Sequence, residues 1–64
     1  MVYRINFEAE IQGLSSLKKV TGDFLVYGES VLEAKQFGQT YLSGIYGTSY
    51  AIIEVLPMFI CNME

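Results

Sequence analysis

Hydrophobic and polar residues alternate along the first segment of the chain, from Val2 to Gln12. Successive side chains of a β-strand point to opposite faces, so this pattern predicts a strand with one buried face and one solvated face. The apolar members are Tyr3, Ile5, Phe7, Ala9 and Ile11, and the polar members are Arg4, Asn6, Glu8, Glu10 and Gln12.

A second alternating segment, residues 18–27, follows a short stretch of turn composition that begins at Gly13 and ends at Ser16. The short connection indicates an antiparallel hairpin. In the second strand Val20, Phe24 and Val26 share one face, and Leu25 and Tyr27 lie on the other.

The periodicity changes after Gly28, where Ser30 and Glu33 have the spacing of a helix-capping box. The following apolar residues have helical spacing. Gly38 lies on this stripe although glycine costs about 1 kcal/mol in a helix relative to alanine, so we expect close approach of the helix to the sheet there. The helix is expected to end at Gly44 or Gly47. The stripe consists of Ala34, Phe37, Gly38, Tyr41, Leu42 and Ile45.

Alternation returns over residues 49–56 and predicts a third strand. One face carries Ala51, Ile53 and Val55. Pro57 cannot donate a ladder hydrogen bond, so it ends this strand or lies on a sheet edge. The other face carries Tyr50, Ile52, Glu54 and Leu56.

These elements predict an α+β fold of order ββαβ, formed as a single small domain over residues 1–64. The simplest assembly is a three-stranded, mainly antiparallel sheet in order 2-1-3, with the helix packed on one face. The pattern leaves open whether the third strand lies beside the first or the second. The expected core consists of Ile5, Phe7, Ala9, Val20, Phe24, Val26, Phe37, Tyr41, Ile53 and Val55.

Composition adds that this chain has more apolar surface than it can bury. Hydrophobic residues make up 52% of the 64 residues and charged residues 17%, where about 25% charged is usual. Domains of this size compensate for a small core with disulfides, metals or association. Cys61 is the single cysteine and histidine is absent, so no internal disulfide and no zinc pattern is expected. Association with a protein is the remaining route.

The net charge of −3, with four basic residues, argues against a nucleic-acid-binding surface. No apolar run approaches the roughly 20 residues of a membrane-spanning helix. The first residues do not resemble a signal peptide. We therefore expect a cytoplasmic protein of a host cell or a virion-associated protein.

No catalytic constellation stands out. The absence of histidine excludes Ser-His and Cys-His arrangements within one chain. Glu8 and Glu10 share a strand face, but solvated charges near Lys19 explain them better than a carboxylate pair does. Residues 44–47 have a Gly-x-x-Gly form, which we interpret as a helix end rather than a nucleotide-binding loop. The sequence therefore predicts no enzyme, no cofactor and no metal site.

The predicted topology places several apolar side chains together on the sheet face away from the helix. Such a cluster is typical of an interface core. The alternative is that the C-terminal tail, with Phe59 and Ile60, folds back and covers the cluster. The predicted partner-binding residues are Val2, Leu25, Tyr27, Tyr50, Ile52, Leu56 and Met58.

The stretch Val26–Ala34, in which a strand leads through small polar residues into Ser-x-x-Glu-Ala, resembles the helix entry of small bacteriophage-encoded strand-strand-helix-strand proteins. The resemblance covers most of the chain as topology and about nine residues as motif. It implies a class of short proteins that act by docking, one of which inhibits a host RNA polymerase, and no functional residue can be carried over from it.

These observations favour a non-catalytic protein-protein interaction module, either a small structural subunit or a self-associating protein, with a homo-oligomer or a larger complex as its setting. The alternative is a phage-type inhibitor or modulator of a host enzyme such as a polymerase, nuclease or defence protein. An enzyme whose site forms between subunits is the third hypothesis.

Overall fold

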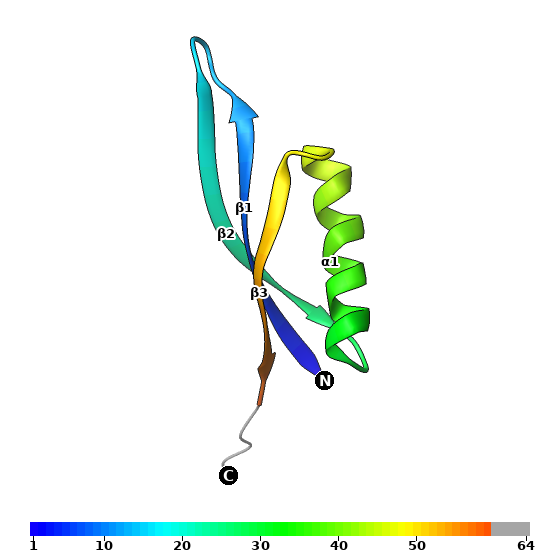
Figure 1. Cartoon of the computed structure of the whole chain (residues 1–64). Helices are drawn as coiled ribbons and strands as arrows, with labels where there is room; N and C mark the ends of the chain where they lie inside the picture. The colour runs from blue at the N-terminus through cyan, green and yellow to red at the C-terminus, as the bar shows by residue number, and fades with distance from the viewer. Residues whose placement is uncertain (60–64) are drawn as a thin grey trace.

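The computed structural model describes residues 1–59, which form a three-stranded sheet with one helix on one face (Figure 1). Its elements are β1 (Val2–Gln12), β2 (Leu17–Tyr27), α1 (Val31–Tyr46) and β3 (Tyr50–Met58). The strand order is β2-β1-β3, and both neighbouring pairs are antiparallel. The α+β class and the ββαβ order are therefore confirmed, and β3 lies beside β1.

The hairpin of β1 and β2 is longer than the part of the sheet that β3 and the helix cover. The two strands pair from Val2 opposite Tyr27 to Gln12 opposite Leu17, whereas β3 pairs with β1 only as far as Ala9. The tip of the hairpin projects beyond α1 and β3 (Figure 1). Residues 11–18 therefore form a ribbon of two strands.

The helix begins and ends where its sequence signals indicate. The Ser30 hydroxyl accepts a hydrogen bond from the Glu33 amide at 3.1 Å, and the Glu33 carboxylate accepts one from the Glu29 amide at 2.7 Å. The first bond satisfies an amide group that a helix start leaves unpaired, and the second ties the residue before the cap to the first turn. At the other end Gly47 adopts φ 66°, which favours glycine, and its amide donates to the Ser43 carbonyl. The helix thus ends at Gly47 rather than Gly44.

The fully buried core lies where the helix approaches β1 most closely. A Cβ atom built on Gly38 would lie 2.5 Å from Cδ1 of Ile5, which is closer than real Cβ contacts allow. The close approach expected at Gly38 is therefore confirmed. The buried hydrophobic residues are Tyr3, Ile5, Ala9, Ala34 and Leu42.

Two aromatic residues expected in the core are instead about half exposed: Phe37 is 48% and Tyr41 is 55% exposed. The reason is that the small residues Ala34 and Gly38 draw the helix toward β1 and β3, to which it lies closer than to β2. Tyr41 and Phe37, one turn apart, lie on the flank toward β2, where the Tyr41 ring is centred 4.8 Å from that of Phe24. The other expected core residues on the strands, except Ile53, are buried or half-buried.

A β-bulge in β3 reverses the predicted faces of residues 50–53 and leaves those of Glu54, Val55 and Leu56 as predicted. Asn6 pairs with Glu54 but the next residue, Phe7, pairs with Ile52, so Ile53 is an extra residue. An extra residue reverses the alternation on one side of it. Ile52 and Tyr50 therefore lie on the helix side, and Ile53, expected in the core, is 57% exposed.

Candidate interaction surface

Two adjacent rows of side chains at one end of the helix-free face carry the predicted cluster. In the first row β1 places Val2 between Tyr27 of β2 and Met58 of β3. In the second row Arg4 lies between Leu25 and Leu56. Residues directly opposite each other in a sheet point to the same face, so these side chains are neighbours. We define the outer patch as Val2, Leu25, Tyr27, Leu56 and Met58.

The outer patch is open to solvent. Tyr27 is 72% exposed, Leu25 is 62% exposed, and Leu56 and Met58 are each 37% exposed, while Val2 is half-buried. Single exposed leucines are ordinary on protein surfaces. Here five apolar side chains from three strands gather around Arg4 in two consecutive rows, and clusters of this kind tend to mark interaction sites.

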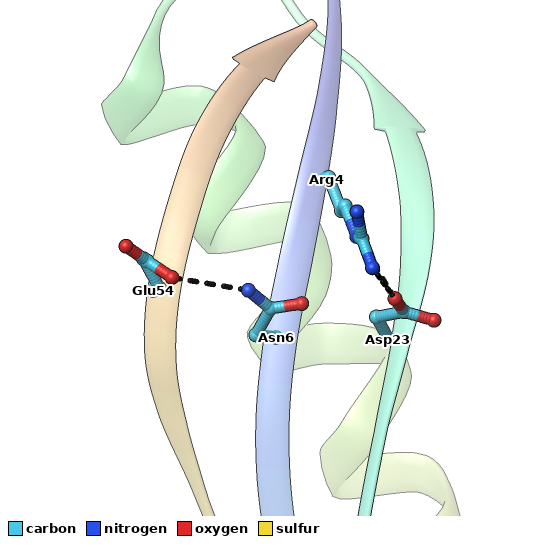
Figure 2. Close-up of polar contacts among 4 residues, drawn as sticks. All are labelled: Arg4, Asn6, Asp23 and Glu54. Atoms are coloured by element: carbon cyan, nitrogen blue, oxygen red, sulfur yellow. Dashed lines mark hydrogen bonds and ion pairs between the residues drawn. The ribbon is translucent and has the colours of Figure 1, made fainter.

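A row of polar side chains borders the outer patch, and Figure 2 shows it on the face opposite the helix. The Arg4 Nε atom donates to the Asp23 carboxylate at 2.8 Å, and the Asn6 amide donates to the Glu54 carboxylate at 3.1 Å. Arg4 therefore extends from the patch toward this row and is held there by Asp23. The arrangement of an apolar cluster beside a polar margin is that of an interface core and its rim.

The prediction that Tyr50 and Ile52 extend the outer patch is wrong, because both side chains lie on the helix side of the sheet. The Tyr50 hydroxyl donates to the Gln39 carbonyl on the helix at 3.4 Å. The Ile52 side chain lies beside Gly38, with its Cδ1 atom 3.5 Å from the position of a Cβ built on that glycine. Both residues belong to the helix-packing face because the bulge at Ile53 reverses the alternation. Five of the seven predicted partner-binding residues are brought together, and these two are not.

The last described residues, Met58 and Phe59, lie at the end of β3 that carries the outer patch. β3 continues through Pro57 to Met58, on the sheet edge that the proline predicts, and Phe59 is exposed. Ile60 and Cys61 lie outside the described residues. Coverage of the patch by the tail therefore stays the alternative to a partner.

The two carboxylates that the sequence analysis weighed as a pair lie on the helix-free face of the sheet. Glu8 forms an ion pair with Lys19 at 3.1 Å across the hairpin. Glu10 is exposed on the same face. Within residues 1–59 no three histidine, cysteine, aspartate or glutamate residues gather as a metal-binding group. In the same range no helix has the length and apolar character to cross a membrane.

The aromatic residues expected in the core do meet on the helix side of β1 and β2, but the sequence did not indicate that this group is left partly open to solvent. Phe24 contacts both Phe7 and Tyr41, with ring centroids 5.8 and 4.8 Å apart, and Phe7 contacts Tyr46 at 5.9 Å. The helical stripe alone could not reveal it, because the stripe contains both small and large apolar residues. The available signal was the spacing of two small residues, Ala34 and Gly38, which lie one turn apart on the same side of the helix. That side packs most closely on the sheet.

Comparison with known proteins adds no relative: no family profile matches the chain, and neither the characterised proteins nor the solved structures compared with it gave a significant match. The resemblance to bacteriophage-encoded proteins therefore stays a prediction.

Proposed function

We propose that this chain is a non-catalytic protein-interaction subunit that associates through the outer patch, with further copies of itself as the partner. The observation that carries the proposal is the meeting of Val2, Leu25, Tyr27, Leu56 and Met58 in two adjacent rows on the helix-free face. A covering protein surface would remove these side chains from water.

The free energy gained by burying apolar side chains supports association through this patch. Complete burial of a leucine or methionine side chain contributes about 1.5–3 kcal/mol relative to exposure. Leu25 and Tyr27 retain most of their accessible surface in the single chain, so much of that gain is still open to them. The fully buried core contains five hydrophobic residues, two of which are alanines. A domain with so small a core gains more from association than a larger domain does.

The test is the solution mass of the purified chain, measured by light scattering over a range of concentrations. The wild-type chain should form a defined multimer, and Leu56→Glu should lower its mass by at least one assembly step. Ala51→Lys is the matched control, because Ala51 is exposed on the same strand and outside the patch. Circular dichroism should show that both variants keep the fold. An unchanged mass for Leu56→Glu would remove the patch from the account.

A second candidate function is binding of one larger enzyme as its modulator. The polar row of Asp23, Asn6 and Glu54 beside the outer patch supports it, because interfaces between independently stable proteins have a solvated polar rim. This function requires a chain that is monomeric alone at all concentrations. Pull-down from a cell extract should then recover one protein with the wild-type chain and lose it with Leu56→Glu.

A further inference from the structure

We propose that two copies of this chain join edge to edge through β2, as antiparallel neighbours related by a two-fold axis at Thr21. The inference shares with the proposed function only the assumption that the chain associates with copies of itself. It concerns a contact different from the outer patch, made by the exposed edge of the sheet, and it names the register of that contact.

Of the two edges of the sheet, β2 is the one suited to pairing with another strand. An edge strand presents unpaired backbone amide and carbonyl groups to solvent. The β3 edge is interrupted by the bulge at Ile53 and by Pro57, which are devices that protect edges from pairing. β2 runs for 11 residues without a proline, and its register with β1 is continuous.

The side chains of β2 complement a second copy of themselves. With the axis at Thr21, each Lys19 lies opposite the partner's Asp23, and this pair occurs twice by symmetry. Each Leu17 lies opposite the partner's Leu25, and the two Thr21 residues face each other. Opposite-charge pairs and Thr–Thr pairs directly across a sheet stabilise it, and like-charge pairs destabilise it.

Neighbouring registers lack this match. An axis at Asp23 would place the two Asp23 carboxylates opposite each other. An axis at Gly22 would place Lys19 opposite the partner's Leu25 and would leave no opposite-charge pair. Lysines on an exposed edge oppose pairing in general. The register at Thr21 gives Lys19 a partner of opposite charge.

The ion pairs already present within each chain extend across this contact. Lys19 is held by Glu8 at 3.1 Å, and Asp23 is held by Arg4 at 2.8 Å. The joined edges would link Glu8, Lys19, the partner's Asp23 and the partner's Arg4 into one network of alternating sign, because both ion pairs run diagonally across the β1–β2 hairpin. Networks of this kind contribute more than isolated surface pairs.

The helix side of the sheet is open along the same edge. A two-fold axis perpendicular to the sheet would place both helices on one face, each beside the projecting hairpin of the other copy. The β2-facing flank of each helix carries Phe37 and Tyr41, which are about half exposed, above the half-buried Phe24. In the register at Thr21 the partner's Lys18 lies opposite Phe24, so the partner's hairpin would lie beside this aromatic group.

The projecting hairpin provides a separate argument. Beyond Glu10 the hairpin consists of β1 and β2 alone, and two-stranded ribbons are marginally stable in water. In the proposed register residues 17–19 of β2 lie beside residues 23–25 of the partner. Residues 17–19, at the start of the projecting part of the hairpin, would thereby gain a third strand beside them.

The test uses two full-length variants, Lys19→Glu and Asp23→Lys, each alone and then mixed. Each variant alone opposes like charges across the axis, so its dimer should dissociate at least tenfold more readily than that of the wild-type chain. A mixture restores two opposite-charge pairs in the heterodimer, so light scattering should again give a dimer with one copy of each variant. A mixture that stays as weakly associated as its components would overturn the proposed register.

A cross-link gives a second readout that does not depend on charge. In a Cys61→Ser background, Thr21→Cys should form an intermolecular disulfide on oxidation, because the two residues lie directly opposite each other. Ala51→Cys, on the outer edge β3, is the control and should stay monomeric on a denaturing gel. Equal cross-linking of the two variants, or none for Thr21→Cys, would overturn the proposal. Failure here with a reduced mass for Leu56→Glu would reject the edge contact and keep the outer patch.

Discussion

Gly38 of the helix lies directly over Ile5 of the central strand, so closely that a Cβ atom on the glycine would lie 2.5 Å from the Ile5 Cδ1 atom. Ile5 is fully buried, and so is Ala34, one helical turn before Gly38. The contact determines how the helix sits on the sheet. It therefore also determines which side chains the helix leaves exposed.

Gly38→Ala should lower the free energy of unfolding by about 1 kcal/mol. Alanine gains about 1 kcal/mol in helix propensity, but crowding against a buried side chain costs about 1–3 kcal/mol. Ile5→Val removes the Cδ1 atom, so the same Gly38→Ala change should stabilise the protein in that background. Urea denaturation of the two single variants and the double variant measures this coupling. Additive effects within about 0.5 kcal/mol would show that the two residues do not limit each other.

The bulge in β3 predicts opposite outcomes for two neighbouring isoleucines. Ile52→Thr should cost about 1–3 kcal/mol, because it places a hydroxyl group against the helix beside Gly38. Ile53→Thr should change stability by about 0.5 kcal/mol or less, because Ile53 is mostly exposed. Thermal or urea denaturation of the two variants compares them directly. The reverse order of stabilities would mean that the strand has no bulge at this position.

The capping box at the start of the helix can be tested with a single hydroxyl group. Ser30→Ala should reduce the free energy of unfolding by about 1 kcal/mol, because it removes the acceptor for the Glu33 amide. Ser43→Ala is a suitable control, since the Ser43 hydroxyl donates to a carbonyl within the exposed helix surface. Equal stability losses for both variants, measured by urea denaturation, would argue against the cap.

Arg4 separates Leu25 from Leu56 within the outer patch, so its replacement tests whether apolar surface drives association. Arg4→Met should strengthen self-association by about tenfold, because it joins the two leucines into one apolar row. Stability should change by about 1 kcal/mol or less, since the Arg4–Asp23 pair is exposed. Arg4→Gln removes the same charge without adding apolar surface. If sedimentation shows both variants equally associated, charge rather than apolar burial controls assembly.

The fold was largely predictable from the sequence because each element carries its own signal. The alternation from Val2 to Gln12, the turn at Gly13 and the spacing of Ser30 and Glu33 are local features with direct structural meaning. Two placements required the structure. The bulge at Ile53 could not be predicted, because four consecutive apolar residues, Tyr50 to Ile53, fit either face.

The exposure of Phe37 and Tyr41 was the second missed placement. An apolar stripe indicates which side of a helix faces a sheet, but not which strand the helix lies above. The position of the helix over the strands depends on how closely it packs at Ala34 and Gly38. At Gly38 the Ile5 side chain of β1 limits that approach. All five residues of the outer patch were among the seven predicted partner-binding residues. Their positions depend on strand order and hairpin register, whereas those of Tyr50 and Ile52 depend on the alternation of β3 near Ile53.

The most direct test of the central claim is the mass of the chain in solution, measured by light scattering for the wild-type protein, Leu56→Glu and Ala51→Lys. The account predicts a multimer for the wild-type chain and for Ala51→Lys, and a smaller species for Leu56→Glu with an unchanged circular dichroism spectrum. A wild-type chain that stays monomeric at every concentration, or a Leu56→Glu variant with the wild-type mass, would contradict it.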